Sequence, residues 1–186
     1  MRNIADSQLA IIGLGYVGLP LAVACCKAGV IGGWQGGTYT RDDEFEAYLK
    51  ALDRIGGAPP IVNIPARWGS DPKWQARIDM LGDYRAPIIL SSLGDPSALV
   101  IRVHQWGGRV IQDVTTMKHA EKAIAAGVDG LMLTCAGAGG HTGFLTPLAF
   151  VPAVPVLLSP CAIPPNSLPN AVCHMSAIAG SFIAFL

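Results

Sequence analysis

Short apolar runs alternate along the chain with longer segments of mixed character. Several of these runs are rich in β-branched residues, as expected for strands of a parallel sheet that is buried on both faces. The predicted strands are Leu9–Ile12, Val30–Gly32, Pro60–Ile64, Pro87–Leu90, Arg109–Gln112, Gly130–Leu133, Val154–Leu158 and Ala177–Ile183.

The intervening segments have helical signals. Asp71 and Asp95 are each followed by proline, the combination typical of an N-cap and a first helical position. Gly127 follows a run of alanines at helical spacing and is a plausible helix end. The predicted helices are Leu19–Ala28, Asp42–Arg54, Asp71–Gly82, Asp95–Trp106 and Thr116–Ala126.

Eight strands separated by helices favour an α/β fold, a (β/α)8 TIM-type barrel, over an open sheet. With 186 residues the chain is short for a fold that usually needs about 200–250. The last stretch, Pro155–Leu186, is rich in prolines and has a poor helical pattern, so no eighth helix is predicted. We therefore expect a single domain over residues 1–186, a barrel that is short or truncated at its C-terminus.

Composition excludes several classes of function. Lys plus Arg equals Asp plus Glu, 13 each, which leaves no basic excess for nucleic acid. The 5 cysteines form no CxxC pair and no metal-ligand spacing is present, so we expect neither disulfides nor a metal, and a cytoplasmic location. An uncharged run over residues 9–26 is interrupted by glycines and Pro20, which argues against a membrane segment.

The first glycine motif follows the first predicted strand. Gly13, Gly15 and Gly18 form GxGxxG, a spacing that lets the backbone approach a pyrophosphate at a helix N-terminus. Residues 9–24 resemble the start of nucleotide-sugar dehydrogenases, which predicts NAD binding as one alternative. The acidic residue that should end the second strand is missing, because Gly33, Trp34 and Gln35 occupy that region. We favour a glycine-rich turn at a barrel mouth.

The second glycine-rich segment follows the sixth predicted strand. It reads Ala-Gly-Ala-Gly-Gly-His-Thr-Gly over residues 136–143. So many small residues after a strand allow a flat or anionic group to lie against bare backbone. His141 could act there as a base near neutral pH, although the residues alone are equally compatible with a flexible surface loop.

Several segments resemble the nitronate monooxygenase (2-nitropropane dioxygenase) family, in order along residues 22–158. The most specific are Gly-Val-Asp-Gly at 127–130 and Ala-Gly-Gly-His-x-Gly at 138–143. The other segments are Cys25–Gly33, Ile61–Ile64, Pro87–Gly94 and Gly107–Val114. Gly180-Ser-Phe-Ile-Ala is similar to the closing phosphate-binding strand of the family.

The resemblance implies an FMN-containing barrel that oxidises alkyl nitronates or nitroalkanes with O2 to a carbonyl compound and nitrite. It assigns His141 as the base that deprotonates a neutral nitroalkane. It further implies cofactor contacts at Asn63, Gln112, Asp129, Ala138, Gly139, Gly140, Gly180 and Ser181. Asp129 also admits a purely structural role.

Two departures from the family pattern motivate a third, non-catalytic alternative, a truncated barrel. Gly13–Gly18 replaces the usual first turn against the flavin, and Cys161–Asn166 replaces a glycine-rich phosphate loop. Pro164 and Pro165 lack the N–H groups that a phosphate would need. The apolar tail Ala177–Leu186 would then favour self-association into a homo-oligomer.

Overall fold

The computed structural model describes residues 10–12, 18–29, 31–38, 41–54, 57, 59–138, 142–157, 176–178 and 181–185. Its strands are β1 (Ala10–Ile12), β2 (Ile31–Gln35), β3 (Ile61–Pro65), β4 (Ile88–Ser92), β5 (Arg109–Val114), β6 (Gly130–Thr134), β7 (Ser176–Ile178) and β8 (Ser181–Phe185). Its α-helices are α1 (Gly18–Lys27), α2 (Asp42–Asp53), α3 (Gln75–Asp83), α4 (Ser97–Gln105), α5 (Met117–Ala125) and α6 (Pro147–Leu157). Short 3-10 turns are η2 (Gly36–Thr38), η3 (Ala66–Gly69) and η4 (Pro72–Trp74).

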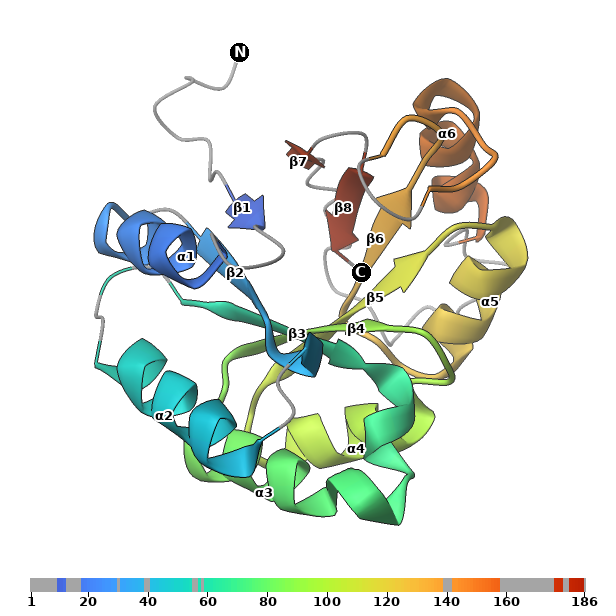
Figure 1. Ribbon diagram of the computed structural model, residues 1–186. Coiled ribbons are helices and arrows are strands. Elements are labelled where there is room, and N and C mark those ends of the chain that lie inside the picture. The colour runs from blue at the N-terminus through green and yellow to red at the C-terminus, as the bar shows by residue number, and fades with distance from the viewer. Residues whose placement is uncertain are drawn as a thin grey trace.

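The strands form one curved sheet in the order β1-β2-β3-β4-β5-β6-β8-β7. Strands β1 to β6 are parallel and follow the sequence order, with helices on the convex side (Figure 1). A doubly wound dinucleotide fold would place its first strand in the middle of the sheet. The sequential order is that of a barrel, so it confirms the barrel prediction and argues against the NAD-binding alternative.

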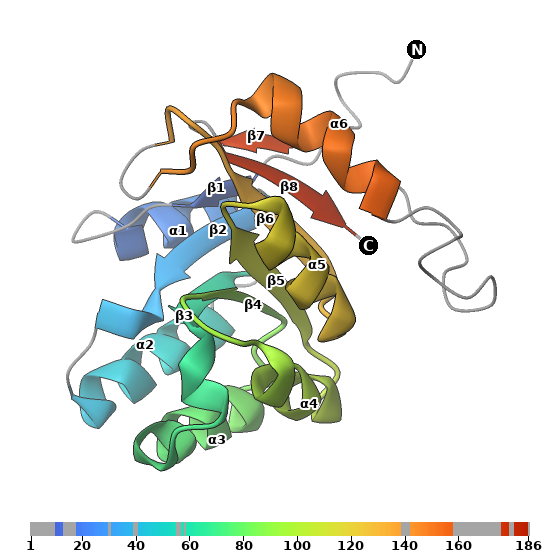
Figure 2. The same cartoon turned by 90° about the vertical axis from the view of Figure 1, so that its right-hand side faces the viewer.

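The C-terminal part differs from the prediction. Val154–Leu158 was expected to be a strand, but residues up to Leu157 belong to α6, where Phe150 and Val154 are buried at helical spacing. Ala177–Ile183 was expected to be one strand, but it contributes to β7 and β8, which pair antiparallel with each other. β8 pairs antiparallel with β6 and contacts α6, and β7 lies near β1 (Figure 2). The parallel repeat therefore ends at β6.

The two faces of the sheet have different neighbours. The outer face packs under the helices and forms the main core, which includes Phe45, Leu99 and Phe150. The inner face carries a separate apolar cluster made by strands alone. Its members are Ile31, Ile61, Ile88, Leu90, Ile111 and Met132. Because side chains alternate along a strand, this cluster identifies which positions of β2 to β6 point inward.

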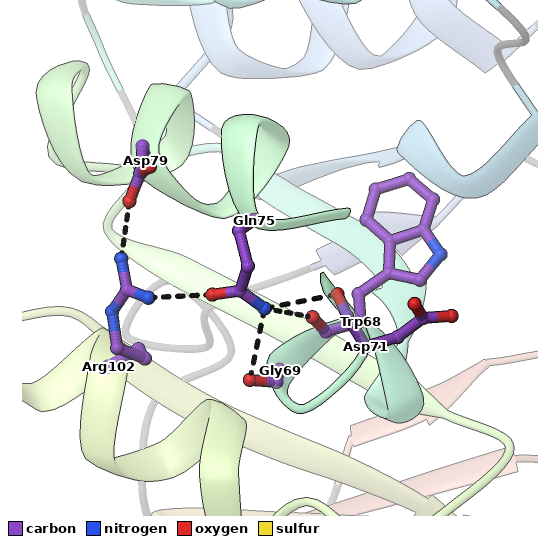
Figure 3. A network of polar contacts seen from close by, with 6 residues as sticks. All are labelled: Trp68, Gly69, Asp71, Gln75, Asp79 and Arg102. Atoms are coloured by element: carbon purple, nitrogen blue, oxygen red, sulfur yellow. Dashed lines mark hydrogen bonds and ion pairs between the residues drawn. The ribbon is translucent and has the colours of Figure 1, made fainter. Parts of the chain in front are cut away.

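A polar network fixes the connection that follows β3 (Figure 3). Gln75 Nε2 lies 3.2, 3.4 and 3.1 Å from the carbonyl oxygens of Trp68, Gly69 and Asp71. Gln75 Oε1 accepts from Arg102 Nη1 at 2.9 Å, and Arg102 Nη2 donates to Asp79 at 2.5 Å. Both ends of the Gln75 amide therefore have partners within the chain, and η3 is tied to α3 and α4.

A buried arginine, Arg77 of α3, packs against the aromatic side chains of α2, η3 and η4. The Arg77 side chain is 2% exposed, and its Nε lies 2.7 Å from Asp42 Oδ1. Its guanidinium carbon lies 5.2, 5.4 and 5.0 Å from the ring centroids of Phe45, Trp68 and Trp74. Burial of a charge among rings is favourable only with such partners. Arg77 therefore links α2, η3 and α3.

Among the described residues, no helix is long and apolar enough to cross a membrane.

Candidate active site at the carboxyl edge of the sheet

The inner face changes from apolar to polar along the strands. The inward positions in the first part of each strand form the apolar cluster, whereas the inward positions at the strand ends carry hydrogen-bonding groups. We call this end, where β2 to β6 finish, the carboxyl edge. The inward polar residues there are Gln35, Asn63, Ser92, Asp113 and Thr134. Active sites of (β/α) barrels lie at this edge, because loops after several strands converge there.

Asn63 and Gln35 form a pair on neighbouring strands. They are register partners between β3 and β2. Asn63 is 6% exposed. Gln35 Oε1 is a buried side-chain acceptor that has no hydrogen-bond partner within the described part of the chain. The predicted residue Asn63 thus lies on the inner face, next to a second amide that the sequence analysis did not select.

Asp113 and Thr134 form a second pair, on β5 and β6. Thr134 Oγ1 donates a hydrogen bond to Asp113 Oδ1 at 2.5 Å, and Thr134 is 4% exposed. Neither residue was among the predicted site residues. The available signal was the period of two, since Asp113 follows Ile111 and Thr134 follows Met132 on the inward side.

Gln112 occupies the other face of β5, contrary to the inward position that was expected. It alternates with Val110 and Val114, which belong to the helix-facing core. Ser91 Oγ donates to Gln112 Oε1, and Gln112 is 5% exposed. The reason is the strand register, which turns Asp113 inward and Gln112 outward. Asp113, not Gln112, therefore offers a polar group of β5 to the inner face.

Asp129 lies at the opposite end of the sheet, immediately before β6. Its Oδ2 accepts from the backbone N–H of Val110 at 2.7 Å and lies 2.9 Å from His104 Nε2. Its own N–H donates to the Val110 carbonyl at 2.8 Å. These contacts hold the starts of β5 and β6 together, which is the structural role that the sequence left open. The structure does not bring Asp129 to the other predicted site residues.

The segment after β6 is anchored to the end of that strand. Thr142 Oγ1 donates to the Cys135 carbonyl at 2.9 Å, and the Ala136 N–H donates to the Leu145 carbonyl at 2.7 Å. A Cβ on Gly143 would lie 2.2 Å from the Thr134 carbonyl oxygen, so no side chain fits. Ala138 lies in this segment at the carboxyl edge. Gly139, Gly140 and His141 lie outside the described residues.

The end of the chain reaches the same edge. Ser181, the first residue of β8, is the register partner of Thr134, the last residue of β6. The backbone of Ser181 is therefore at the carboxyl edge. Gly180 and the altered segment Cys161–Asn166 lie outside the described residues.

Two other titratable groups, Cys135 and Asp95, are held by burial or by hydrogen bonds within the chain. Cys135 is fully buried in the helix-facing core, and burial raises the pKa of its thiol, which disfavours the reactive thiolate. Asp95, after β4, accepts from the Ser97 hydroxyl at 2.6 Å and the Ser97 N–H at 2.9 Å, and these bonds lower its pKa. No group of three or more His, Cys, Asp or Glu suited to a metal occurs in the described part of the chain.

The side chains of the inner face are of chemical kinds suited to a flat, partly polar cofactor. Apolar side chains cover the middle of the inner face, and amide, hydroxyl and carboxyl groups line its carboxyl edge. Gln35 Oε1 is buried and has no hydrogen-bond donor among the described residues, whereas most buried acceptors in proteins have one. A flavin ring combines apolar faces with an edge of hydrogen-bonding atoms, so these residues are suited to hold it.

Comparison with known proteins identifies a family and several relatives with similar sequences. The family described as nitronate monooxygenase matches residues 61–164, more than half of the chain. A carboxyl-CoA dehydrogenase from Mycobacterium tuberculosis (strain ATCC 25618 / H37Rv), named (3aS,4S,5R,7aS)-5-hydroxy-7a-methyl-1-oxo-octahydro-1H-indene-4-carboxyl-CoA dehydrogenase, is 28% identical over 143 residues. That match covers 76% of this chain and 39% of the relative, so the chain spans well under half of the relative's length. A protein of the same name from Rhodococcus jostii (strain RHA1) is 29% identical with the same coverage.

Solved structures show the same fold. FabK from Thermotoga maritima superimposes with a TM-score of 0.69 at 23% identity, covering 80% of this chain and 47% of FabK. Nitroalkane oxidase from Streptomyces ansochromogenes superimposes with a TM-score of 0.60 at 24% identity, covering 73% of this chain and 47% of the oxidase. With the sequential parallel strands and the matched stretch of residues 61–164, the chain belongs to the nitronate monooxygenase family.

Proposed function

We propose that the chain forms the flavin-binding domain of an FMN-dependent oxidoreductase that oxidises alkyl nitronates or nitroalkanes with O2. The observation that carries the proposal is the polar carboxyl edge above an apolar inner floor, where Asn63, Asp113 and Thr134 lie. Family membership supports the flavin, and the anchored loop around Thr142 and Gly143 supports a site beside β6. Bound FMN would supply the electron acceptor, and the chain would orient it and the substrate.

In this proposal each residue has a limited task. Asn63 and the Asp113–Thr134 pair would hydrogen-bond the cofactor edge or the substrate. The small residues of the loop after β6 would leave backbone free to approach the cofactor. Ser181 and Gly180 would lie at the phosphate, and His141 would remove the proton from a neutral nitroalkane.

The role of His141 has a specific test. We expect His141→Asn to abolish turnover of neutral nitroalkane and to leave turnover of preformed nitronate within about threefold, because only the neutral substrate needs a base. Oxygen consumption with each substrate would measure this. Equal losses on both substrates would remove the base assignment.

A second candidate substrate class rests on the two actinobacterial relatives, whose names describe dehydrogenases of a carboxyl-CoA compound. In this alternative the same flavin site would oxidise a thioester-bearing substrate. Anaerobic mixing separates the two classes. A nitronate should bleach the absorbance of the bound flavin if the first proposal holds, whereas bleaching by an acyl-CoA thioester alone would favour the second.

A further inference from the structure

Gln35 is a residue of the carboxyl edge whose side-chain oxygen has no hydrogen-bond donor among the described residues. It ends β2 on the inner face, beside its register partner Asn63. Its Oε1 is shielded from solvent, and within the described residues it is the one buried side-chain polar atom without a hydrogen-bond partner. A buried acceptor without a donor is costly, and such groups in native proteins call for an explanation.

The backbone around Gln35 is firmly held. Thr38 Oγ1 donates to the Gln35 carbonyl at 3.1 Å, which closes the η2 turn. A Cβ on Gly36 would lie 3.0 Å from Val62 Cγ1, and a Cβ on Gly37 would lie 2.9 Å from Pro65 Cδ. The turn is therefore pressed against the end of β3. This packing fixes the origin of the Gln35 side chain at the carboxyl edge.

Packing alone does not require an amide at this position. Methionine has nearly the same length and shape as glutamine and would fill the space without a buried acceptor. By contrast, Gln75 uses both ends of its amide within the chain. The unpaired acceptor of Gln35 therefore points to a donor that arrives with a bound ligand.

We propose that Gln35 Oε1 accepts a hydrogen bond from the ring N–H of bound FMN and so orients the ring. The oxidised isoalloxazine ring has one N–H, at N3, whereas its dimethylbenzene edge has none. An acceptor at β2 thus discriminates between the two edges of an otherwise flat ring. This inference rests on the proposed function, which places the ring beside Asn63 on the adjoining strand.

The test compares two proteins with two cofactors. Quenching of flavin fluorescence would give the Kd of FMN and of 3-methyl-FMN, which lacks the N3–H, for the unaltered chain and for Gln35→Met. We expect the unaltered chain to bind 3-methyl-FMN about 10-fold more weakly than FMN, the size of one hydrogen bond. Gln35→Met should bind FMN about 10-fold more weakly and should not distinguish the two cofactors.

Thermal unfolding of the cofactor-free protein separates this role from a structural one. Because Gln35→Met removes an unpaired acceptor, its Tm should be equal to or above that of the unaltered chain. Gln105→Met, at an exposed position at the end of α4, is the matched control and should change neither Kd nor Tm.

Three results would overturn the inference. These are equal affinity of the unaltered chain for both cofactors, unchanged FMN affinity in Gln35→Met, or a lower Tm of cofactor-free Gln35→Met, which would mark a packing role. Failure of the unaltered chain to bind FMN at all is a different result, because it would reject the proposed function itself.

Discussion

Gln75 and Gln35, two glutamines of the same barrel, differ in how the described chain pairs their side chains. Gln75 is the first residue of α3 and has partners for both its oxygen and its nitrogen. Gln35 lies on the inner face at the end of β2, and its buried oxygen has no partner among the residues that the structure describes. The Gln75 amide is thus fully hydrogen-bonded within the chain, whereas the Gln35 oxygen at the carboxyl edge lacks a donor among the described residues. We therefore expect substitutions around Gln75 to lower the free energy of unfolding, and substitutions at the carboxyl edge to lower the affinity for FMN.

The largest loss of stability is expected at Arg77. Arg77→Ala removes the contacts with three aromatic rings and the ion pair with Asp42. We expect the free energy of unfolding to fall by about 3 kcal/mol, since cation–π contacts and side-chain packing are lost together. Urea unfolding would measure it. Arg41→Ala, which breaks an exposed ion pair with Asp43, is the control and should have little effect.

If Arg77→Ala were no more destabilising than Arg41→Ala, the aromatic cluster around Arg77 would have no special role in the outer sector.

An intermediate loss is expected at Gln75. Gln75→Leu removes the acceptor of Arg102 Nη1 and the donor to three backbone carbonyls, and this should cost about 2 kcal/mol of unfolding free energy. Chemical denaturation followed by tryptophan fluorescence would report it. The affinity for FMN should stay within about twofold. Gln75→Leu as stable as Gln35→Met would erase the contrast between the two glutamines.

A smaller loss is expected at Asp129, far from the carboxyl edge. Asp129→Ala removes the acceptor of the Val110 N–H and the partner of His104, which should cost about 1 kcal/mol. FMN affinity should not change, because the residue lies at the start of β6. Thermal unfolding and flavin titration of one sample give both quantities. A marked loss of FMN affinity with unchanged stability would return Asp129 to the cofactor site.

Periodicity along the sequence predicted the barrel because each of the first five strands is a short apolar run followed by a segment with helical signals. It did not predict α6, since Pro152 and Pro155 argue against a helix, although Phe150 and Val154 are spaced for one buried face. It also did not predict the antiparallel pairing of β7 and β8, because the residues of a strand do not specify its direction.

For the site, resemblance selected Asn63, which the structure places on the inner face. It selected Gln112 instead of Asp113, because choosing between adjacent polar residues needs the strand register. Gln35 and Thr134 were not selected, since an unpaired acceptor or a threonine–aspartate bond appears only when strands are placed side by side. His141 remains a prediction from the sequence.

The central claim is that the inner carboxyl edge binds FMN, and an equilibrium titration of the purified chain with FMN tests it most directly. The chain and Asn63→Leu would be compared by flavin fluorescence, with desalting and a visible spectrum afterwards. We predict saturable binding of one FMN per chain, retained flavin bands after desalting, and affinity at least about 10-fold weaker in Asn63→Leu. A chain that stays colourless after reconstitution, or equal affinity of the two proteins, would contradict the claim.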